Sequence, residues 1–176
     1  IKRSKTDIIV FPELCLVGYP PTDILEWPSE QTRISDAINK IKVITVGRDQ
    51  LVILGVPMHE AGAWYNSVIC ISNGQVLHRY DKQLLPNYDI FNEARYFSAG
   101  KKSPVFKWKN HTIGILICED IWFSSKRHLL DPCVAFDGVA MDLVVHVAAS
   151  PFEKDKIYER THRLKTLQSR VDCHVV

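Results

Sequence analysis

An apolar run that ends in a cysteine and two carboxylates constrains this chain more than any other stretch. Residues 113–122 read IGILICEDIW, so a segment of strand-like residues is followed directly by Cys118, Glu119 and Asp120. Open α/β sheets place their reactive groups at the carboxyl ends of their strands. A cysteine in that position can act as a nucleophile, and we therefore expect a reactive site at the end of this strand.

Length and composition indicate one globular domain that spans residues 1–176. The 176 residues are 46% hydrophobic and 24% charged, which is ordinary for a protein with a substantial core. A net charge of +2 gives no electrostatic case for a nucleic-acid or membrane partner. No apolar stretch approaches the roughly 20 residues of a membrane span, and no signal peptide is recognised. We therefore expect a cytoplasmic protein.

The cysteines and histidines form no metal-binding pattern. Five cysteines are scattered along the chain without a C-x-x-C pair: Cys15, Cys70, Cys118, Cys133 and Cys173. This arrangement argues against a disulfide framework and a zinc ribbon. His59 and Glu60 begin a zinc-protease pattern, but Ala63 stands where that pattern needs its second histidine. We expect no metal site.

Alternating strand and helix signals predict an α/β fold with a mixed sheet. Asn73 and Gly74 mark a hairpin between two strands, and proline at 57 is expected to close the strand before it. Helices are expected at 29–46, from Ser124 or Ser125 to about Phe136, and at 153–170. Strands are expected at 6–11, 51–56, 66–71, 76–80, 105–108, 112–117, 141–147 and from 173 onward.

Four of these strands end in a reactive or polar residue, namely Glu13, Lys82, Cys118 or Ser150. If the strands share a sheet, the groups converge on one face. Cys118 would then attack an electrophilic carbon, while Glu13 takes its proton and later protonates the leaving nitrogen. Lys82 would stabilise the developing oxyanion and favour the cysteine thiolate.

Each of these residues also has an ordinary structural explanation. Cys118 alone fits a buried core residue, Glu13 a loop carboxylate and Lys82 a solvated lysine at a strand end. Only their combination favours a cysteine hydrolase.

Three segments together resemble the signature blocks of the carbon–nitrogen hydrolase (nitrilase) superfamily. They are residues 11–20 (FPELCLVGYP), 80–86 (YDKQLLP) and 117–122 (ICEDIW), and their order and separations also fit. Residues 85–97 (LPNYDIFNEARYF) resemble one branch in particular, the glutamine amidohydrolase domain of glutamine-dependent NAD+ synthetases. The sequences at 18–21 and 150–152 agree with that branch.

The resemblance implies a fold, a reaction and site residues. It implies an αββα sandwich, a catalytic triad of Glu13, Lys82 and Cys118, and Glu93 as a second carboxylate near the lysine. The reaction is glutamine hydrolysis through a γ-glutamyl thioester on the cysteine, without a cofactor in this domain. The family pattern assigns three further residues to glutamine binding: Tyr88, Ser150 and Lys156. A packed aromatic and a solvated lysine remain the alternatives for Tyr88 and Lys156, and Phe123 either lines the pocket or belongs to the core.

The chain departs from the family pattern at several places. The pattern normally has a strand and a helix before Phe11 and continues beyond residue 176, and no Ser-Gly-Gly phosphate loop occurs. We therefore expect an amidohydrolase domain without its first strand and helix and without its C-terminal end. ATP, Mg²⁺ and deamido-NAD+ would belong to an absent synthetase domain of the parent chain, and a homo-oligomer is expected. Ala148 replaces a frequent asparagine.

Two other functions remain open from the sequence. The chain could be a stand-alone amidase or nitrilase of the same superfamily that acts on another amide or nitrile. It could also be an inactive domain that docks to a partner or regulates it. The aromatic segment at 87–97 argues against the first alternative, and the complete Glu13, Lys82 and Cys118 set argues against the second.

Overall fold

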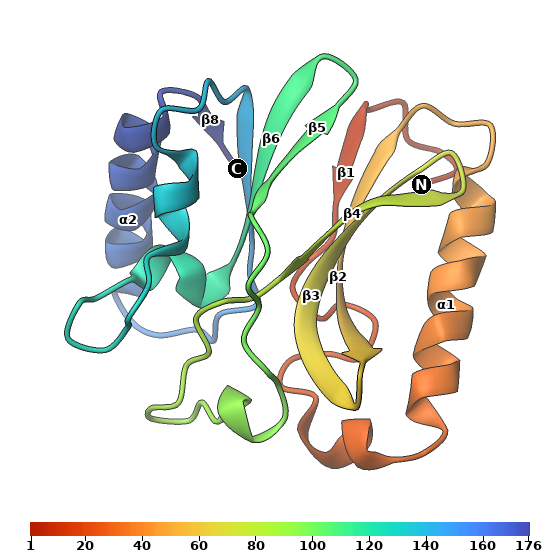
Figure 1. The fold of residues 1–176 in the computed structure, drawn as a ribbon, viewed down its shortest axis with the longest axis horizontal. Coiled ribbons are helices and arrows are strands. Elements are labelled where there is room, and N and C mark those ends of the chain that lie inside the picture. The colour runs from red at the N-terminus through yellow and green to blue at the C-terminus, as the bar shows by residue number, and fades with distance from the viewer.

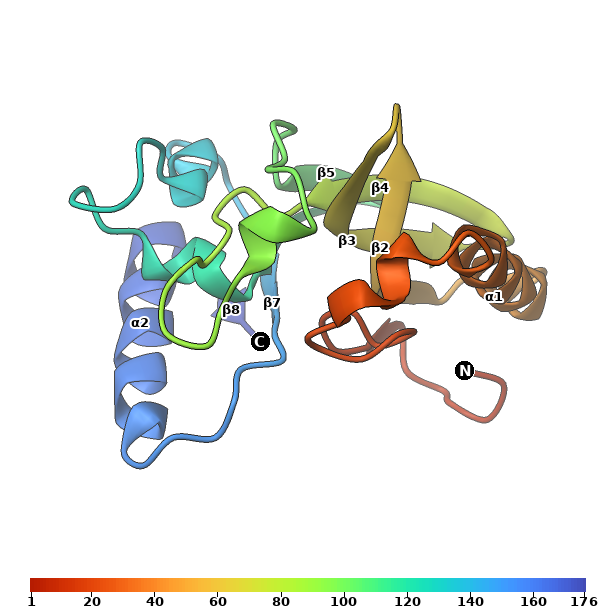
Figure 2. The same ribbon diagram turned by 90° about the horizontal axis from the view of Figure 1, so that it is seen from below.

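Two four-stranded sheets face each other, and one α-helix covers the outer side of each sheet (Figures 1 and 2). The computed structural model describes residues 1–176. In Figure 1 the layers run from α1 (Glu30–Thr45) through both sheets to α2 (Lys156–Val171). The predicted αββα sandwich is confirmed. No helix has both the length and the apolar character needed to cross a membrane.

The first sheet has the strand order β1-β2-β3-β4. Its strands are β1 (Ile8–Val10), β2 (Leu51–Glu60), β3 (Ala63–Ser72) and β4 (Gln75–Asp81). The first two strands are parallel, whereas β2, β3 and β4 form an antiparallel meander. The hairpin predicted around Asn73 and Gly74 joins β3 to β4. Glu13 and Lys82 therefore follow strands of the same sheet.

The second sheet has the order β5-β6-β7-β8. Its strands are β5 (Val105–Trp108), β6 (His111–Ile117), β7 (Leu143–Val147) and β8 (His174–Val175). β5 and β6 are antiparallel, whereas β6, β7 and β8 run parallel. The parallel direction of β6 and β7 brings the residues that follow both strands to the same edge, which places Cys118 beside the segment that contains Ser150.

Alternate residues of the central strands face different layers of the core. In β2, Ile53 packs between the two sheets and Leu54 packs in the cluster beneath α1. In β6, Ile115 packs between the sheets and Leu116 packs in the cluster beneath α2. Successive side chains of a strand point to opposite faces, so strands covered on both faces carry continuous apolar runs.

One predicted strand end and one predicted helix are wrong, and a proline is involved in both. β2 continues through Pro57, which is in register with Asn66 of β3, to Glu60. β1 pairs with β2 only as far as Ile53, so Pro57 lies where β2 has one neighbouring strand and a missing N–H is tolerated. The helix expected from Ser124 to Phe136 is absent.

Two short 3₁₀ helices lie in this part of the chain, and only the second falls within the range of the expected helix. They span Cys118–Trp122 (η3) and Pro132–Phe136 (η4). A helix through this region would place Pro132 in its interior, where proline removes a backbone donor and clashes with the preceding turn. The structure instead uses Pro132 at the start of η4, where the Asp131 side chain accepts a hydrogen bond from the Cys133 N–H at 3.0 Å.

Two glycines allow the backbone to pack closely behind the strand ends that carry Glu13 and Lys82. A Cβ on Gly55 would lie 2.2 Å from the Pro12 carbonyl oxygen and 2.8 Å from the Glu13 Cα. A Cβ on Gly100 would lie 2.1 Å from the Asp81 carbonyl oxygen. Both clashes involve backbone atoms, which cannot rotate away. Glycine at these positions is therefore part of how the sequence positions the two strand ends.

We predict that Gly55→Ala destabilises the fold much more than Gly114→Ala. The first substitution forces backbone atoms apart and should cost about 3 kcal/mol or more, at the upper end of overpacking effects. The second meets side-chain atoms of Phe136 and Met141, which lie 2.8–3.0 Å from the added Cβ and can shift. Its cost should be about 1 kcal/mol. Urea unfolding of both variants measures the difference, and equal free energies of unfolding would contradict the proposed backbone clash.

Candidate active site

A fully buried lysine lies between two buried carboxylates. The Lys82 Nζ donates to Glu13 Oε1 at 2.9 Å and to Glu93 Oε1 at 2.6 Å, and the lysine side chain has no exposed surface. Burial opposes the charge of the ammonium, but Glu13, Cys118 and Glu93 together outweigh it. They hold the pKa of Lys82 well above its usual value. The structure thus brings together the predicted Glu13, Lys82 and Glu93.

Neutral donors complete the hydrogen bonding of the two carboxylates. The Asn66 Nδ2 donates to Glu13 Oε1 at 2.8 Å and to Glu93 Oε2 at 3.4 Å. The Tyr19 hydroxyl donates to Glu93 Oε1 at 2.7 Å, and the Ala149 N–H donates to Glu13 Oε2 at 3.0 Å. Sequence reasoning missed Asn66, although a polar residue beside the apolar run of β3 was a usable signal. Together these donors fix both carboxylates around the buried ammonium.

Cys118 occupies a strained backbone position at the point where β6 becomes η3. Its φ is +42°, in the left-handed region that side chains with a Cβ rarely adopt, and it is 6% exposed. Its Sγ lies 3.5 Å from the Ser150 Oγ. Burial and then Glu13 raise the pKa of the thiol to about 12, although Lys82 acts in the opposite direction. The lysine thus favours the thiolate, but with a pKa of about 12 the resting thiol is protonated.

Asp120 joins the strand end that carries the lysine to the strand end that carries the cysteine. Its side chain is fully buried, and its Oδ2 accepts from the Tyr80 hydroxyl and from the Ile117 N–H, both at 2.9 Å. Its Oδ1 accepts from the N–H groups of Gln83 at 3.2 Å and Leu84 at 3.0 Å. Sequence reasoning gave this aspartate no role. One carboxylate therefore ties the end of β4 to the end of β6.

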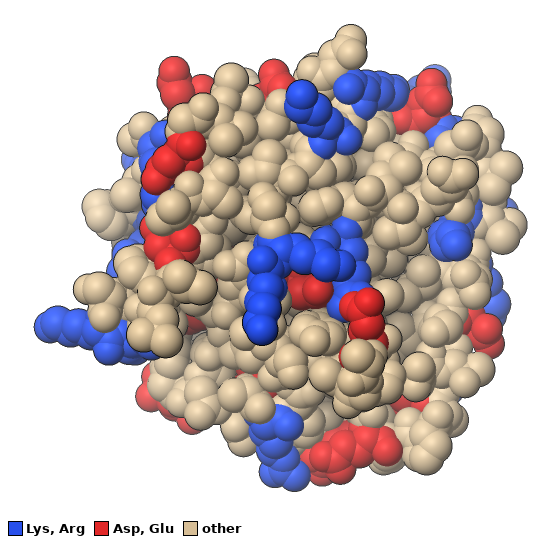
Figure 3. Space-filling model, viewed as in Figure 1, with Lys and Arg blue, Asp and Glu red and all other residues tan.

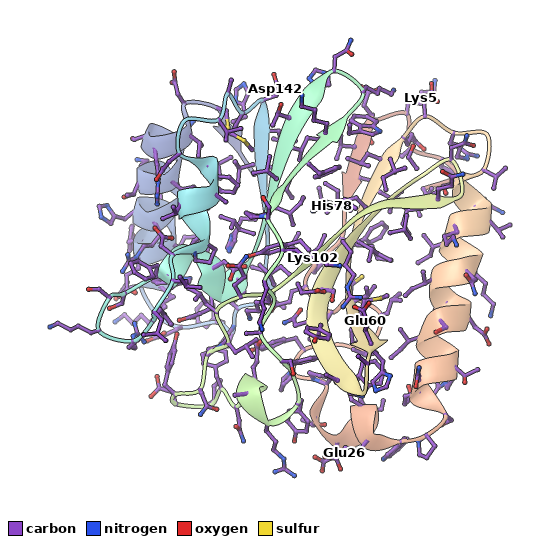
Figure 4. All side chains as sticks on the ribbon, viewed as in Figure 1. Lys5, Glu26, Glu60, His78, Lys102 and Asp142 are labelled. Carbon is purple, nitrogen blue, oxygen red and sulfur yellow. The ribbon has the colours of Figure 1, made fainter.

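Ion pairs fix the last residue of β4. Charged groups of both signs gather near the middle of the face seen in Figure 3, and Figure 4 places Glu60 and Lys102 in this area. Arg79 pairs with Glu60 at 2.8 Å and with Asp81 at 2.7 Å. Asp81 directly precedes Lys82, so the second ion pair holds the backbone from which the buried lysine side chain extends.

A cavity of about 350 Å³ opens onto the cysteine. Its walls include all three residues predicted to bind substrate, Tyr88, Ser150 and Lys156. Trp122 also lines it, whereas Phe123 lies at a separate small cavity behind η3. The chain contains no group of three or more histidine, cysteine or acidic side chains placed to hold a metal ion. The cavity can therefore bring a small polar molecule to the thiol.

Glu119 is a cavity residue for which the sequence predicted no separate role. Its Oε2 accepts a hydrogen bond from the Tyr88 hydroxyl at 2.8 Å. Its Oε1 is buried without a hydrogen-bond partner, and the His128 Nε2 lies 3.8 Å from it. Burial raises the pKa of Glu119. Unsatisfied buried carboxylate oxygens are costly, so this atom is suited to accept hydrogen bonds from a cationic ligand.

Removal of the buried cation should destabilise the fold. In Lys82→Met, Glu13 and Glu93 face each other without a counter-charge, which should cost about 3–5 kcal/mol of unfolding free energy. The triple variant that also carries Glu13→Gln and Glu93→Gln should regain part of this loss. Lys102→Met, at an exposed lysine, is the matched control and should change little. Urea denaturation measures all four proteins, and similar losses in both lysine variants would contradict this account.

Asp120 should contribute a distinct pH dependence to stability. Burial raises its pKa from 3.8 to about 6, so its contribution is complete below pH 3.8 and is lost as the pH rises through about 6. The stability advantage of the wild type over Asp120→Asn should therefore shrink between pH 4 and 7. Unfolding free energies across this range test the prediction. A difference that stays constant across this range would contradict it.

The chain is similar to known proteins in both sequence and fold. Residues 1–132 match the carbon-nitrogen hydrolase family. The chain is 35% identical over 176 residues to the glutamine-dependent NAD(+) synthetase of Acinetobacter baylyi, covering 99% of this chain and 31% of that protein. The glutamine-dependent NAD+ synthetase of Acinetobacter baumannii has a TM-score of 0.86 at 32% identity, covering 97% of this chain and 31% of the other.

A CN-hydrolase superfamily protein of Xanthomonas campestris has a TM-score of 0.73 at 18% identity, covering 98% of this chain and 64% of that chain. At this identity the likeness concerns the fold alone. The present chain spans 31% of the length of each of the two Acinetobacter synthetases. The match over residues 1–132 covers most of the chain and includes Glu13, Lys82 and Cys118, and it shows that the chain belongs to the carbon-nitrogen hydrolase family.

Proposed function

We propose that this chain hydrolyses the side-chain amide of glutamine to glutamate and ammonia, as the glutaminase part of a glutamine-dependent NAD+ synthetase. The observation that carries the proposal is the buried Glu13–Lys82 pair beside Cys118, which itself lines a cavity together with Glu119. The similarity to two Acinetobacter synthetases supports the choice of substrate. Basic and acidic residues both line the cavity, which favours an amino acid over an apolar amide as the substrate.

The first half-reaction forms a thioester on the cysteine. The Cys118 thiol gives its proton to Glu13 as Sγ attacks the amide carbon, because its raised pKa keeps it protonated until then. Lys82 stabilises the negative charge that develops on the amide oxygen. Glu13 then donates the proton to the leaving nitrogen, and the C–N bond breaks to release ammonia. The product is a γ-glutamyl thioester.

The second half-reaction releases glutamate. Water attacks the thioester carbon while Glu13 accepts a proton from it, and the C–S bond breaks. The thiolate is then reprotonated, which restores the resting thiol. Glu93 receives hydrogen bonds from both Lys82 and Tyr19, so in this proposal it holds the ammonium in place through both steps. Each step uses only protons carried by side chains and water.

Glutamine binding would use the cavity walls. Glu119 Oε1 would accept hydrogen bonds from the α-ammonium group, and the Tyr88 hydroxyl orients that carboxylate through its bond to Oε2. Lys156, which lines the cavity at the start of α2, would also contact the glutamine. Ser150, whose Oγ is 3.5 Å from the Cys118 Sγ, would contact the reacting amide.

The remaining reaction would take place outside this chain. We place ATP, Mg²⁺ and deamido-NAD+ in a synthetase domain of the parent protein, where the ammonia replaces an adenylate to form NAD+. The proposed glutaminase mechanism uses only side chains and water, so the glutaminase domain needs no cofactor. A cytoplasmic location and a homo-oligomer complete the proposal.

Ammonia release from three classes of substrate tests the proposed function. The wild type should release ammonia from glutamine and much less from asparagine or a simple nitrile. Only glutamine is long enough to place its amide at Cys118 while its α-amino-acid group contacts Glu119 and the other proposed binding residues. Cys118→Ala should abolish release, and Cys173→Ala, at a cysteine remote from the cavity, should retain it. Comparable turnover of unrelated amides or nitriles would support a stand-alone amidase or nitrilase instead. No turnover by the folded wild type would support a docking or regulatory domain.

A further inference from the structure

The cavity beside Cys118 is lined by four basic and four acidic residues, and the ion pairs among them leave three arginines without a partner. Lys156 is already paired with Glu153 at 3.5 Å and with Glu159 at 3.2 Å. Three arginines also line the cavity and form no ion pair with any carboxylate: Arg127, Arg160 and Arg163. A cavity with unpaired cations in its wall is suited to an anionic group on its ligand.

Arg127 differs from the other two arginines by its position. Its guanidinium lies 4.8 Å from the centre of the Tyr88 ring, and the Tyr88 hydroxyl donates to Glu119. The positive charge of Arg127 also favours the ionised form of Glu119. Arg163 instead lies 5.4 Å from the centre of the Trp122 ring. Arg127 is therefore the unpaired arginine beside the carboxylate with the free oxygen.

We propose that Arg127 binds the α-carboxylate of the substrate, next to the α-ammonium at Glu119. This inference rests on the proposed glutaminase function and adds a specificity-determining residue to it. The two charged groups of an amino acid share one carbon atom, so their receptors must be neighbours. Arg127 and Glu119 meet this requirement through Tyr88, and a guanidinium can hold both oxygens of a carboxylate at once.

Two analogues of glutamine, each lacking one charged group, separate this role from a general effect on the site. Glutarate monoamide keeps the carboxylate but has no ammonium, and 4-aminobutanamide keeps the ammonium but has no carboxylate. Arg127→Gln should lower kcat/KM for glutamine and for glutarate monoamide by about tenfold or more, the loss expected for one charge-assisted hydrogen bond. It should leave kcat/KM for 4-aminobutanamide unchanged. Arg127→Lys should retain part of the activity on the two carboxylates.

Lys126→Gln is the matched control for loss of a surface charge. Lys126 is the exposed neighbour of Arg127 and does not line the cavity, so this variant should have wild-type kcat/KM values on all three amides. An equal loss on all three amides in Arg127→Gln, or no loss on any of them, would overturn the proposal. A loss of the same pattern in Lys126→Gln would also overturn it, because it would show a long-range charge effect.

Binding measurements provide a readout that does not depend on turnover. In a Cys118→Ala background, calorimetry should show that Arg127→Gln weakens binding of glutamine and of glutarate monoamide, with unchanged binding of 4-aminobutanamide. If the wild type hydrolyses glutamine but Arg127→Gln shows no carboxylate-specific loss, only the role of Arg127 fails. If the wild type does not hydrolyse glutamine and Cys118→Ala does not bind it, the proposed function itself fails and the inference falls with it.

Discussion

The buried ammonium of Lys82 is the constraint on which the rest of the site depends. A lysine with no exposed surface is stable only when opposite charges and hydrogen bonds replace its water. Glu13 and Glu93 supply the charges, and Asn66 supplies a donor that both carboxylates share. The geometry of the proposed catalytic site and the balance of charge in the core therefore depend on the same contacts, and a change in one partner changes both.

The fold brings that network to the nucleophile because the residues come from strand ends of two different sheets. Lys82 follows β4 of the first sheet, Cys118 follows β6 of the second, and Asp120 accepts hydrogen bonds from the segments beside both. The sandwich core holds the sheets at a fixed spacing, and the aspartate fixes the two ends within it. Gly55 adds a third restraint, because the backbone that carries Glu13 packs directly against it.

The sequence was sufficient to locate the site residues that follow strand ends. It was not sufficient to predict features that depend on tertiary contacts. Glu13, Lys82 and Cys118 were recognisable because each follows an apolar run, and the structure brings them together, while their catalytic roles remain predictions. The contacts of Asp120 could not be predicted from the sequence, because the groups that donate hydrogen bonds to it come from two segments far apart in the chain. The helix expected through Pro132 was wrong because a possible serine N-cap was given more weight than the backbone donor that proline lacks.

The protonated state of Cys118 affects its chemistry outside the catalytic cycle. Oxidation of a cysteine by peroxides follows its thiolate character and its exposure. The Cys118 thiol has a pKa of about 12 and is 6% exposed, so almost none of it is thiolate at neutral pH. In the proposed mechanism, the thiolate forms only when Glu13 removes the proton. The resting protein thus carries a strong nucleophile in a form that resists irreversible oxidative loss.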